Sequence, residues 1–166
     1  MLYLKENIID FGGMFDGCEH LTKIEGELDT STGKNFMCMF RDCKILEDIQ
    51  GLKNCDFSNG EDFNEMFSNC PVIYSWEPLK NWKLLNGKQF TEMFHLCKFS
   101  NVDFLSNLSV PKGMIFNRMF SSCPFLRDIN GLKDWDVSVL FLFLKCFLNV
   151  ILWKISMELK IGKPKI

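Results

Sequence analysis

One eight-residue pattern returns five times along this chain: Phe, two residues, Met-Phe, two residues, Cys. The copies occupy residues 11–18, 36–43, 63–70, 90–97 and 116–123, at spacings of 25, 27, 27 and 26 residues. A fixed period of about 20 to 50 residues is typical of proteins built from stacked repeats, in which each unit buries its apolar face against its neighbours. The pattern therefore predicts a stacked architecture and says more about shape than about chemistry.

Within each repeat, the apolar residues predict two kinds of local structure. The Phe, Met, Phe and Cys of the copy at 63–70 lie at i, i+3, i+4 and i+7, as on one face of a two-turn helix. After the cysteine the spacing changes to threes, as in Cys43, Leu46 and Ile49. Neither a helix nor a strand keeps that period for long. We therefore expect a leucine-rich-repeat-like solenoid, with one short helix and one short parallel β-strand in each coil of about 26 residues.

The repeat pattern divides the chain into two predicted parts. Residues 1–138 form the five-repeat solenoid, and residues 139–166 form a hydrophobic tail of different character. A solenoid normally begins with an atypical capping unit. None precedes the first copy, so we expect the solenoid to be a fragment of a longer array. The first residues also lack the basic start and apolar run of a secretory signal.

Three interpretations of the tail remain open. The apolar segment 139–153 could anchor the chain in a membrane, although Lys145 interrupts it and a bilayer span needs about 20 apolar residues. A buried capping helix is the second interpretation. The third, which we favour, is a frameshift between residues 138 and 145 that makes residues 139–166 a frameshifted sixth repeat. Several codons can encode each residue of the tail. When such codons are read in a shifted frame, they can encode a sixth Met-Phe-x-x-Cys motif, whose Cys lies about 26 residues after Cys123.

The residues around the motif resemble a known family. The stretches Met39-Phe-Arg-Asp-Cys-Lys-Ile-Leu46, Met119-Phe-Ser-Ser-Cys-Pro-Phe-Leu126 and Trp135-Asp-Val-Ser138 resemble the BspA-like leucine-rich-repeat surface proteins, including mycoplasma-type lipoprotein surface repeats. The resemblance covers residues 8 to 138. The chain departs from that family where Ile-x-Gly-Leu-Lys replaces the usual Leu-Asp-Leu-Ser. The resemblance implies a cell-surface solenoid used for adhesion and protein–protein contact, without catalytic residues.

Composition and residue spacing argue against a nucleic-acid-binding, metal-binding or catalytic site. A net charge of −2 with interspersed signs is not typical of a nucleic-acid binder. Five of the eight cysteines share one repeat position, which predicts a buried ladder rather than the closely paired ligands of a zinc site. The two histidines, His20 and His95, show no spacing that pairs them with a cysteine nucleophile. We therefore expect no enzyme activity, cofactor or metal.

The remaining candidate is a binding surface. Residues between the apolar threes should face outward, and extended repeat surfaces commonly bind partners. The candidate partner-binding residues are Lys23, Glu47, Asp48, Tyr74, Ser75, Arg127 and Asp128. The leading hypothesis is a non-catalytic module that binds a protein or a glycan. The alternatives are a truncated or decayed gene product without a function of its own, and a repeat protein anchored in a membrane through residues 139–153.

Overall fold

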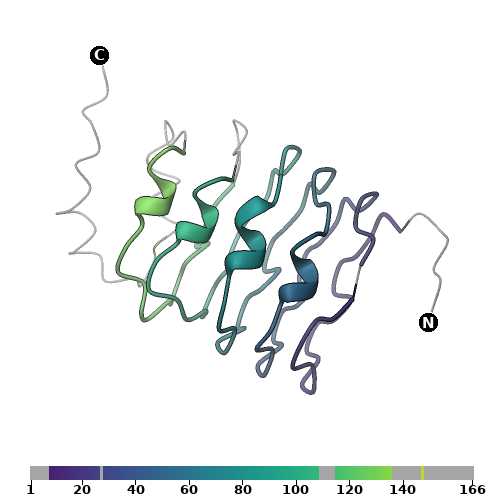
Figure 1. Cartoon of the computed structure of the whole chain (residues 1–166), viewed down its shortest axis with the longest axis horizontal. Coiled ribbons are helices and arrows are strands. Elements are labelled where there is room, and N and C mark those ends of the chain that lie inside the picture. The colour runs from purple at the N-terminus through teal and green to yellow at the C-terminus, as the bar shows by residue number, and fades with distance from the viewer. Residues whose placement is uncertain (1–7, 27, 109–114, 136–146, 148–166) are drawn as a thin grey trace, which may run out of the picture.

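The repeats lie side by side in chain order, so that the molecule is a row of stacked coils (Figure 1). The structure is a computed structural model, and it describes residues 8–26, 28–108, 115–135 and 147. Four short 3₁₀-helices occur in the described residues, and they follow one another along one side of the stack (Figure 1). They are η1 (Gln50–Leu52), η2 (Glu77–Asn81), η3 (Asp103–Leu105) and η4 (Asn130–Leu132).

Backbone hydrogen bonds join each coil to the next. The motif segment of one coil donates alternate N–H groups to carbonyl oxygens of the following coil. In the second coil these bonds run from the N–H groups of Phe36, Cys38, Phe40 and Asp42 to the carbonyl oxygens of Asp62, Asn64, Met66 and Ser68, at 2.8–2.9 Å. Isolated parallel bridges link the start of the same segments, at Asp10, Asn35, Asp62, Gln89 and Ile115. The described residues contain such bridges and no longer strand.

The helix expected over the motif does not form. The N–H groups that do not reach the next coil instead close turns within their own coil, as in the 3.2 Å bond from Met39 N to Phe36 O. Cys38 has a φ of 57°, and a positive φ at the third residue is what a type II turn requires. The ribbon repeats every four residues, so residues at i, i+3, i+4 and i+7 face the same side, as they would on a helix. The periodicity thus predicted the buried face correctly and the backbone wrongly.

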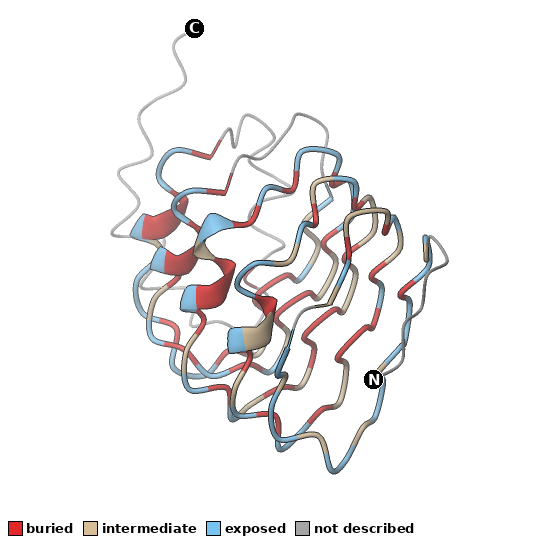
Figure 2. Cartoon of the chain, turned by 45° about the vertical axis from the view of Figure 1, so that its right-hand side comes forward, coloured by how far each residue is buried: buried red, intermediate tan, exposed pale blue. Residues whose placement is uncertain are grey.

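Two columns of stacked phenylalanine rings form the centre of the core. The rings are buried, except for the half-buried Phe15 and Phe116 at the ends. Figure 2 shows that buried residues recur along the stacked coils. Successive centroids lie 5.1–5.5 Å apart in the first column and 5.3–6.1 Å apart in the second, and the ring planes are within 25° of parallel. Large aromatic rings dominate the apolar area that a core removes from water. The first column contains Phe11, Phe36, Phe63, Phe90 and Phe116, and the second contains Phe15, Phe40, Phe67, Phe94 and Phe120.

The glycine three residues before the second, third and fourth motif copies is needed for close packing. A Cβ atom at Gly60 would overlap the Cζ atom of Phe63, and the same holds at Gly33 and Gly87 for the phenylalanines that follow them. None of these glycines has a positive φ among the described residues. The phenylalanine ring therefore folds back onto the glycine, and any side chain there would displace the first ring column.

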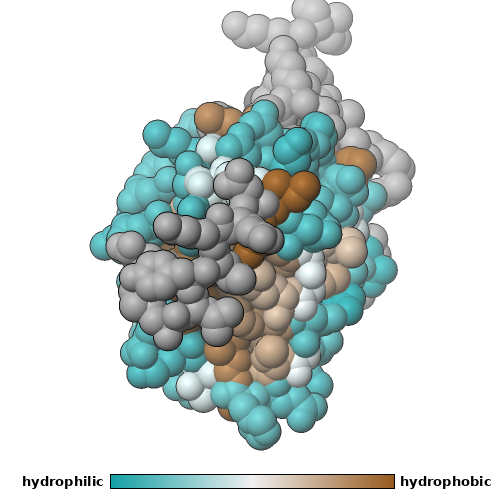
Figure 3. Space-filling view, turned by 90° about the vertical axis from the view of Figure 1, so that its right-hand side faces the viewer, coloured by the Kyte–Doolittle hydropathy of each residue, from teal (hydrophilic) through white to brown (hydrophobic). Residues whose placement is uncertain are grey.

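The first coil is less buried than those behind it. Figure 3 looks along the stack from this end and shows hydrophobic side chains in the middle, surrounded by hydrophilic ones. Met14 is 38% exposed, whereas Met39 and Met66 are fully buried. Phe15 and Cys18 are only partly buried. In the first coil only Phe11 of the motif is fully buried, at 1% exposed, whereas the Phe, Met and Cys side chains of the second and third motif copies are all buried.

The expectations for the tail fall mostly outside the described residues. A membrane anchor over 139–153 and a frameshifted repeat over 139–166 both concern residues of which only Phe147 is described, and the boundary at residue 138 lies outside as well. In the part of the chain that the structure does describe, no helix is long and apolar enough to cross a membrane.

We expect Leu96→Asn to stabilise the protein. Leu96 has a φ of 59° and is 41% exposed. The same repeat position holds Gly17, Asp42 and Asn69, whose residue types tolerate left-handed backbone better than leucine does. Urea unfolding should show a gain of about 1 kcal/mol. The control is Leu85→Asn, since Leu85 is also exposed but has no positive φ. An equal gain in the control would contradict this account.

Candidate interaction surface

Outward side chains on the helix side of the stack align in what we call the outer row. The alignment comes from backbone bonds between coils: Glu47 N to Thr22 O is 2.8 Å, and Tyr74 N to Glu47 O is 3.1 Å. A 2.9 Å bond from Arg127 N to Ser100 O continues the pattern in the last two coils. The row is therefore Thr22, Glu47, Tyr74, Ser100 and Arg127, and all five residues are exposed. Three of the predicted binding residues lie in it: Glu47, Tyr74 and Arg127.

The residues immediately after the outer row form a second row, which we call the cap row. It consists of Lys23, Asp48, Ser75, Asn101 and Asp128. Parallel bridges join Lys23 to Asp48 and Asn101 to Asp128. The other four predicted binding residues, Lys23, Asp48, Ser75 and Asp128, belong to this row.

Most cap-row side chains bond to the backbone of their own coil. The carboxylate of Asp48 accepts the N–H of Gln50 at 2.8 Å, and that of Asp128 accepts the N–H of Asn130, also at 2.8 Å. These acceptors satisfy the first N–H group of each 3₁₀-helix in the manner of an Asx turn. Ser75 contributes a longer contact of 3.4 Å to Glu77 N. The sequence reasoning missed this structural role, although an acidic, amide or hydroxyl residue recurs at the position.

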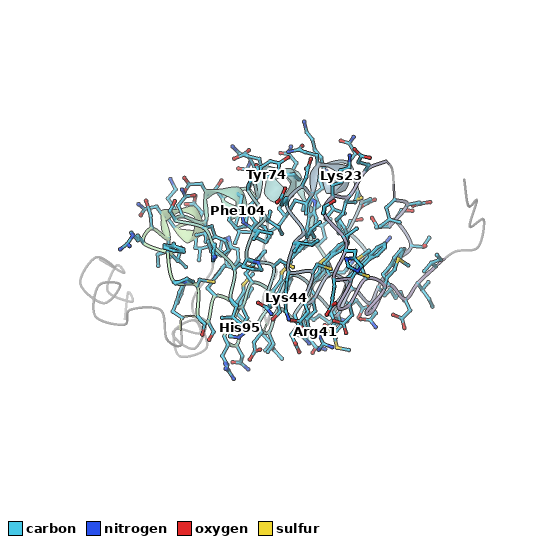
Figure 4. All side chains as sticks on the ribbon, turned by 90° about the horizontal axis from the view of Figure 1, so that it is seen from below. Lys23, Arg41, Lys44, Tyr74, His95 and Phe104 are labelled. Atoms are coloured by element: carbon cyan, nitrogen blue, oxygen red, sulfur yellow. The ribbon has the colours of Figure 1, made fainter. Side chains whose placement is uncertain are left out.

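Tyr74 is the most exposed large hydrophobic residue among those described, at 67%. A hydrogen bond to Asp48 of the preceding coil is the main cause that raises the pKa of the Tyr74 hydroxyl, and the negative charge of Asp48 acts in the same direction. Lys23 pairs with Glu25 at 2.6 Å, and this bond raises the pKa of the Lys23 ammonium group. Figure 4 shows Tyr74 and Lys23 on the same side of the molecule as Phe104 of η3.

A row of exposed apolar residues lies two positions before the outer row. Ile45, Val72 and Phe125 are 41%, 39% and 50% exposed. The residues between the two rows, Leu46, Ile73 and Leu126, are buried. This alternation places both rows on the outer surface, and we call the first the apolar row. In the sequence, this apolar row corresponds to an alternation with a period of two. The sequence reasoning missed it because the apolar spacing of three is more regular.

The opposite side of the stack carries ion pairs between coils. The guanidinium group of Arg41 makes two bonds to Asp16, at 2.9 and 2.6 Å, and one to Glu65 at 3.2 Å. Arg118 pairs with Glu92 at 3.2 Å. Figure 4 shows Arg41 and His95 on this side, away from Tyr74. Because their donors and acceptors already pair with one another, these residues are a less suitable surface for a partner.

The repeated cysteine is part of the core, as its repeat position predicts. Cys43, Cys70, Cys97 and Cys123 are buried, and each thiol donates to the carbonyl oxygen of a phenylalanine in the preceding coil at 3.0–3.1 Å. Burial raises the pKa of Cys43 to about 11 and that of Cys123 to about 12. Thiols of this kind are poor nucleophiles and poor metal ligands, because both roles require the thiolate.

Metal-binding geometry is also missing from the described residues. They contain no group of three or more His, Cys, Asp and Glu side chains that could hold a metal ion. All seven cysteines that the structure describes are free. The outer row and the apolar row together form the surface that we call the wall.

Comparison with known proteins identifies a family. A family model described as "Mycoplasma protein of unknown function, DUF285" matches residues 3–107 and, in a second overlapping match, residues 48–150. The two matches together extend over most of the chain. Neither the comparison with curated proteins nor that with solved structures gave a match.

We expect the cap row and the outer row to respond differently to truncation. Asp128→Ala removes the acceptor for the N–H of Asn130 and should lower the free energy of unfolding by about 1 kcal/mol. Arg127→Ala, in the adjacent outer row, should change it by less than about 0.5 kcal/mol. Urea unfolding of the two variants measures the difference. If Arg127→Ala costs as much as Asp128→Ala, the assignment of Asp128 to a structural role is wrong.

We also expect the stability to fall above pH 9 because of the buried thiols. Burial raises the pKa of Cys123 from an ordinary value of 9.0 to about 12, so the unfolded chain releases this proton at a lower pH than the folded one. The stability that depends on the neutral thiol is present below pH 9 and is lost as the pH rises toward 12. Urea unfolding at about pH 8 and about pH 10.5 should show a smaller fall for Cys123→Val than for the wild type. An identical fall in both proteins would argue against this linkage.

Proposed function

We propose that this chain, which belongs to the Mycoplasma family of unknown function DUF285, is a leucine-rich-repeat-like solenoid that serves as a non-catalytic protein-binding module. The resemblance of its motifs to BspA-like surface repeats supports a role in adhesion or in contact between proteins at a cell surface. The buried, hydrogen-bonded cysteine column supports the non-catalytic part of the proposal.

The observation that carries the proposal is the composition of the wall on the helix side. Four of the ten exposed large hydrophobic residues among those described lie on this wall, in two adjacent rows. They are Ile45, Val72, Tyr74 and Phe125. The other six are at scattered repeat positions, and single exposed apolar residues are normal on any soluble surface. Exposed apolar residues that gather on one surface mark a site of interaction more often than scattered ones do.

The chemistry of the two rows favours a protein partner over a glycan. Tyrosine and arginine are enriched at the energetically important positions of protein interfaces, and the outer row contains Tyr74 and Arg127. The neighbouring aliphatic side chains of Ile45 and Val72 offer apolar area that a sugar ring uses poorly. A partner that lies along the wall would bury Tyr74 and Phe125. At the margin, it would replace water around Glu47 and Arg127.

The proposal is tested by cross-linking at Tyr74. The photoreactive residue p-benzoylphenylalanine replaces Tyr74 in one variant and Leu85 in a control, because both side chains are more than half exposed, at 67% and 53%. The variants are irradiated in the cells that produce the protein. We expect a discrete cross-linked species from position 74 and none from position 85. The same adducts from both positions, or none from position 74, would contradict the proposal.

A second substitution makes the test specific for the wall. Phe125→Asp puts a charge into the apolar row, where Phe125 is 50% exposed, so the fold should tolerate it. If the partner lies along the wall, this change should reduce the cross-link from position 74. An undiminished cross-link would show that the partner contacts Tyr74 alone.

A further inference from the structure

The first motif copy differs from the other four in the residues between its apolar positions. It reads Phe-Gly-Gly-Met-Phe-Asp-Gly-Cys, with glycine at three of the four variable positions, whereas the other copies have no glycine there. Glycine has no side chain, so another backbone can approach it closely. The first coil therefore presents a bare backbone edge at the end of the stack that Figure 3 shows.

This edge carries carbonyl oxygens without donors. In the second coil, carbonyl oxygens at alternate positions accept N–H groups of the first coil, as Met39 O accepts Phe15 N at 2.9 Å. The corresponding carbonyl oxygens of the first coil are those of Gly12, Met14 and Asp16. They accept no backbone N–H group from the residues that the structure describes. An unpaired backbone edge is a template on which another chain can pair.

The side chains beside this edge are open on the same face. Met14 is 38% exposed, and Phe15 and Cys18 are only partly buried, although their counterparts in the second coil are fully buried. Phe11 is buried at 1% exposed, so the open part of the face begins after it. An accessible phenylalanine ring and an accessible methionine therefore lie next to the three unpaired carbonyl oxygens.

We infer that this open face of the first coil binds an extended segment of another protein that contains a phenylalanine. The segment donates alternate N–H groups to the carbonyl oxygens of Gly12, Met14 and Asp16, and its phenylalanine ring stacks on that of Phe15. The same interface joins the first coil to the second, where the rings of Phe15 and Phe40 lie 5.3 Å apart. Main-chain hydrogen bonds provide the affinity and the side chain provides the specificity, as in other complexes formed by strand addition.

A second copy of this chain fits the face less well than a segment of another protein. Two first coils placed face to face bring carbonyl oxygens against carbonyl oxygens. The opposite end of the stack offers no open ring in the second phenylalanine column, because Phe120 is 1% exposed and Phe147 lies 5.4 Å from it. The inference concerns this end of the stack and does not rest on the proposed binding wall.

A peptide with the sequence of residues 37–46 tests the inference, since it contains one motif phenylalanine and the alternate N–H donors. Fluorescence anisotropy with the full-length protein, under reducing conditions, should show saturable binding. Met14→Glu puts a charge on the face and should weaken binding at least about 10-fold. The control is Met37→Glu, because Met37 is 43% exposed but belongs to a coil with neighbours on both sides. It should change the affinity by less than about 2-fold.

Two altered peptides test the contacts without changing the protein. Alanine at the position of Phe40 removes the ring that stacks on Phe15, and a methyl group on the Phe40 nitrogen removes the donor to Met14 O. Each change should weaken binding at least about 10-fold. No saturable binding below about 1 mM, or equal effects of Met14→Glu and Met37→Glu, would overturn the inference. Dimers in analytical ultracentrifugation that Met14→Glu abolishes would overturn it in favour of a second copy.

Discussion

The hydrogen-bonded ladder between motif segments is the constraint on which the rest of the molecule depends. Each of the first four segments closes tight turns with about half of its N–H groups and directs the other half to carbonyl oxygens of the next coil. Buried backbone groups must be paired, so no coil is stable alone. The ladder also fixes the distance between coils at a value that lets phenylalanine rings stack at 5.1–6.1 Å. Backbone pairing and core packing are thus satisfied by the same spacing.

Because the coils repeat in register, the residues at one repeat position form a row, and several of these rows have one physical role each. The cysteine row donates to backbone carbonyls in the core. The cap row satisfies the first N–H group of the 3₁₀-helices. On the opposite side of the stack, Arg41 pairs with the carboxylates of Asp16 and Glu65 in the neighbouring coils. The outer row and the apolar row are the least committed to such bonds, and this is why the proposed binding surface lies there.

The two ends of the stack differ in the same terms. Phe15 in the first coil is only partly buried, whereas Phe120 in the fifth is covered by Phe147. A coil exposes apolar rings on its outer face unless something equivalent lies against it. The ring of Phe147, 5.4 Å from that of Phe120, supplies that cover for the second phenylalanine column.

The sequence by itself determined the repeat, its period and the residues that face inward, because burial of Phe63, Met66 and Cys70 depends only on which side of the chain they occupy. It did not determine the backbone: a helix and a ribbon of alternating turns both place residues i, i+3, i+4 and i+7 on one face. It also did not separate Asp48, which caps a helix, from Glu47, which faces outward. Only the tertiary structure decided these points. The acceptors for Phe36 N and its neighbours lie about one coil further along the chain, and a local sequence pattern does not indicate hydrogen bonds between residues so far apart.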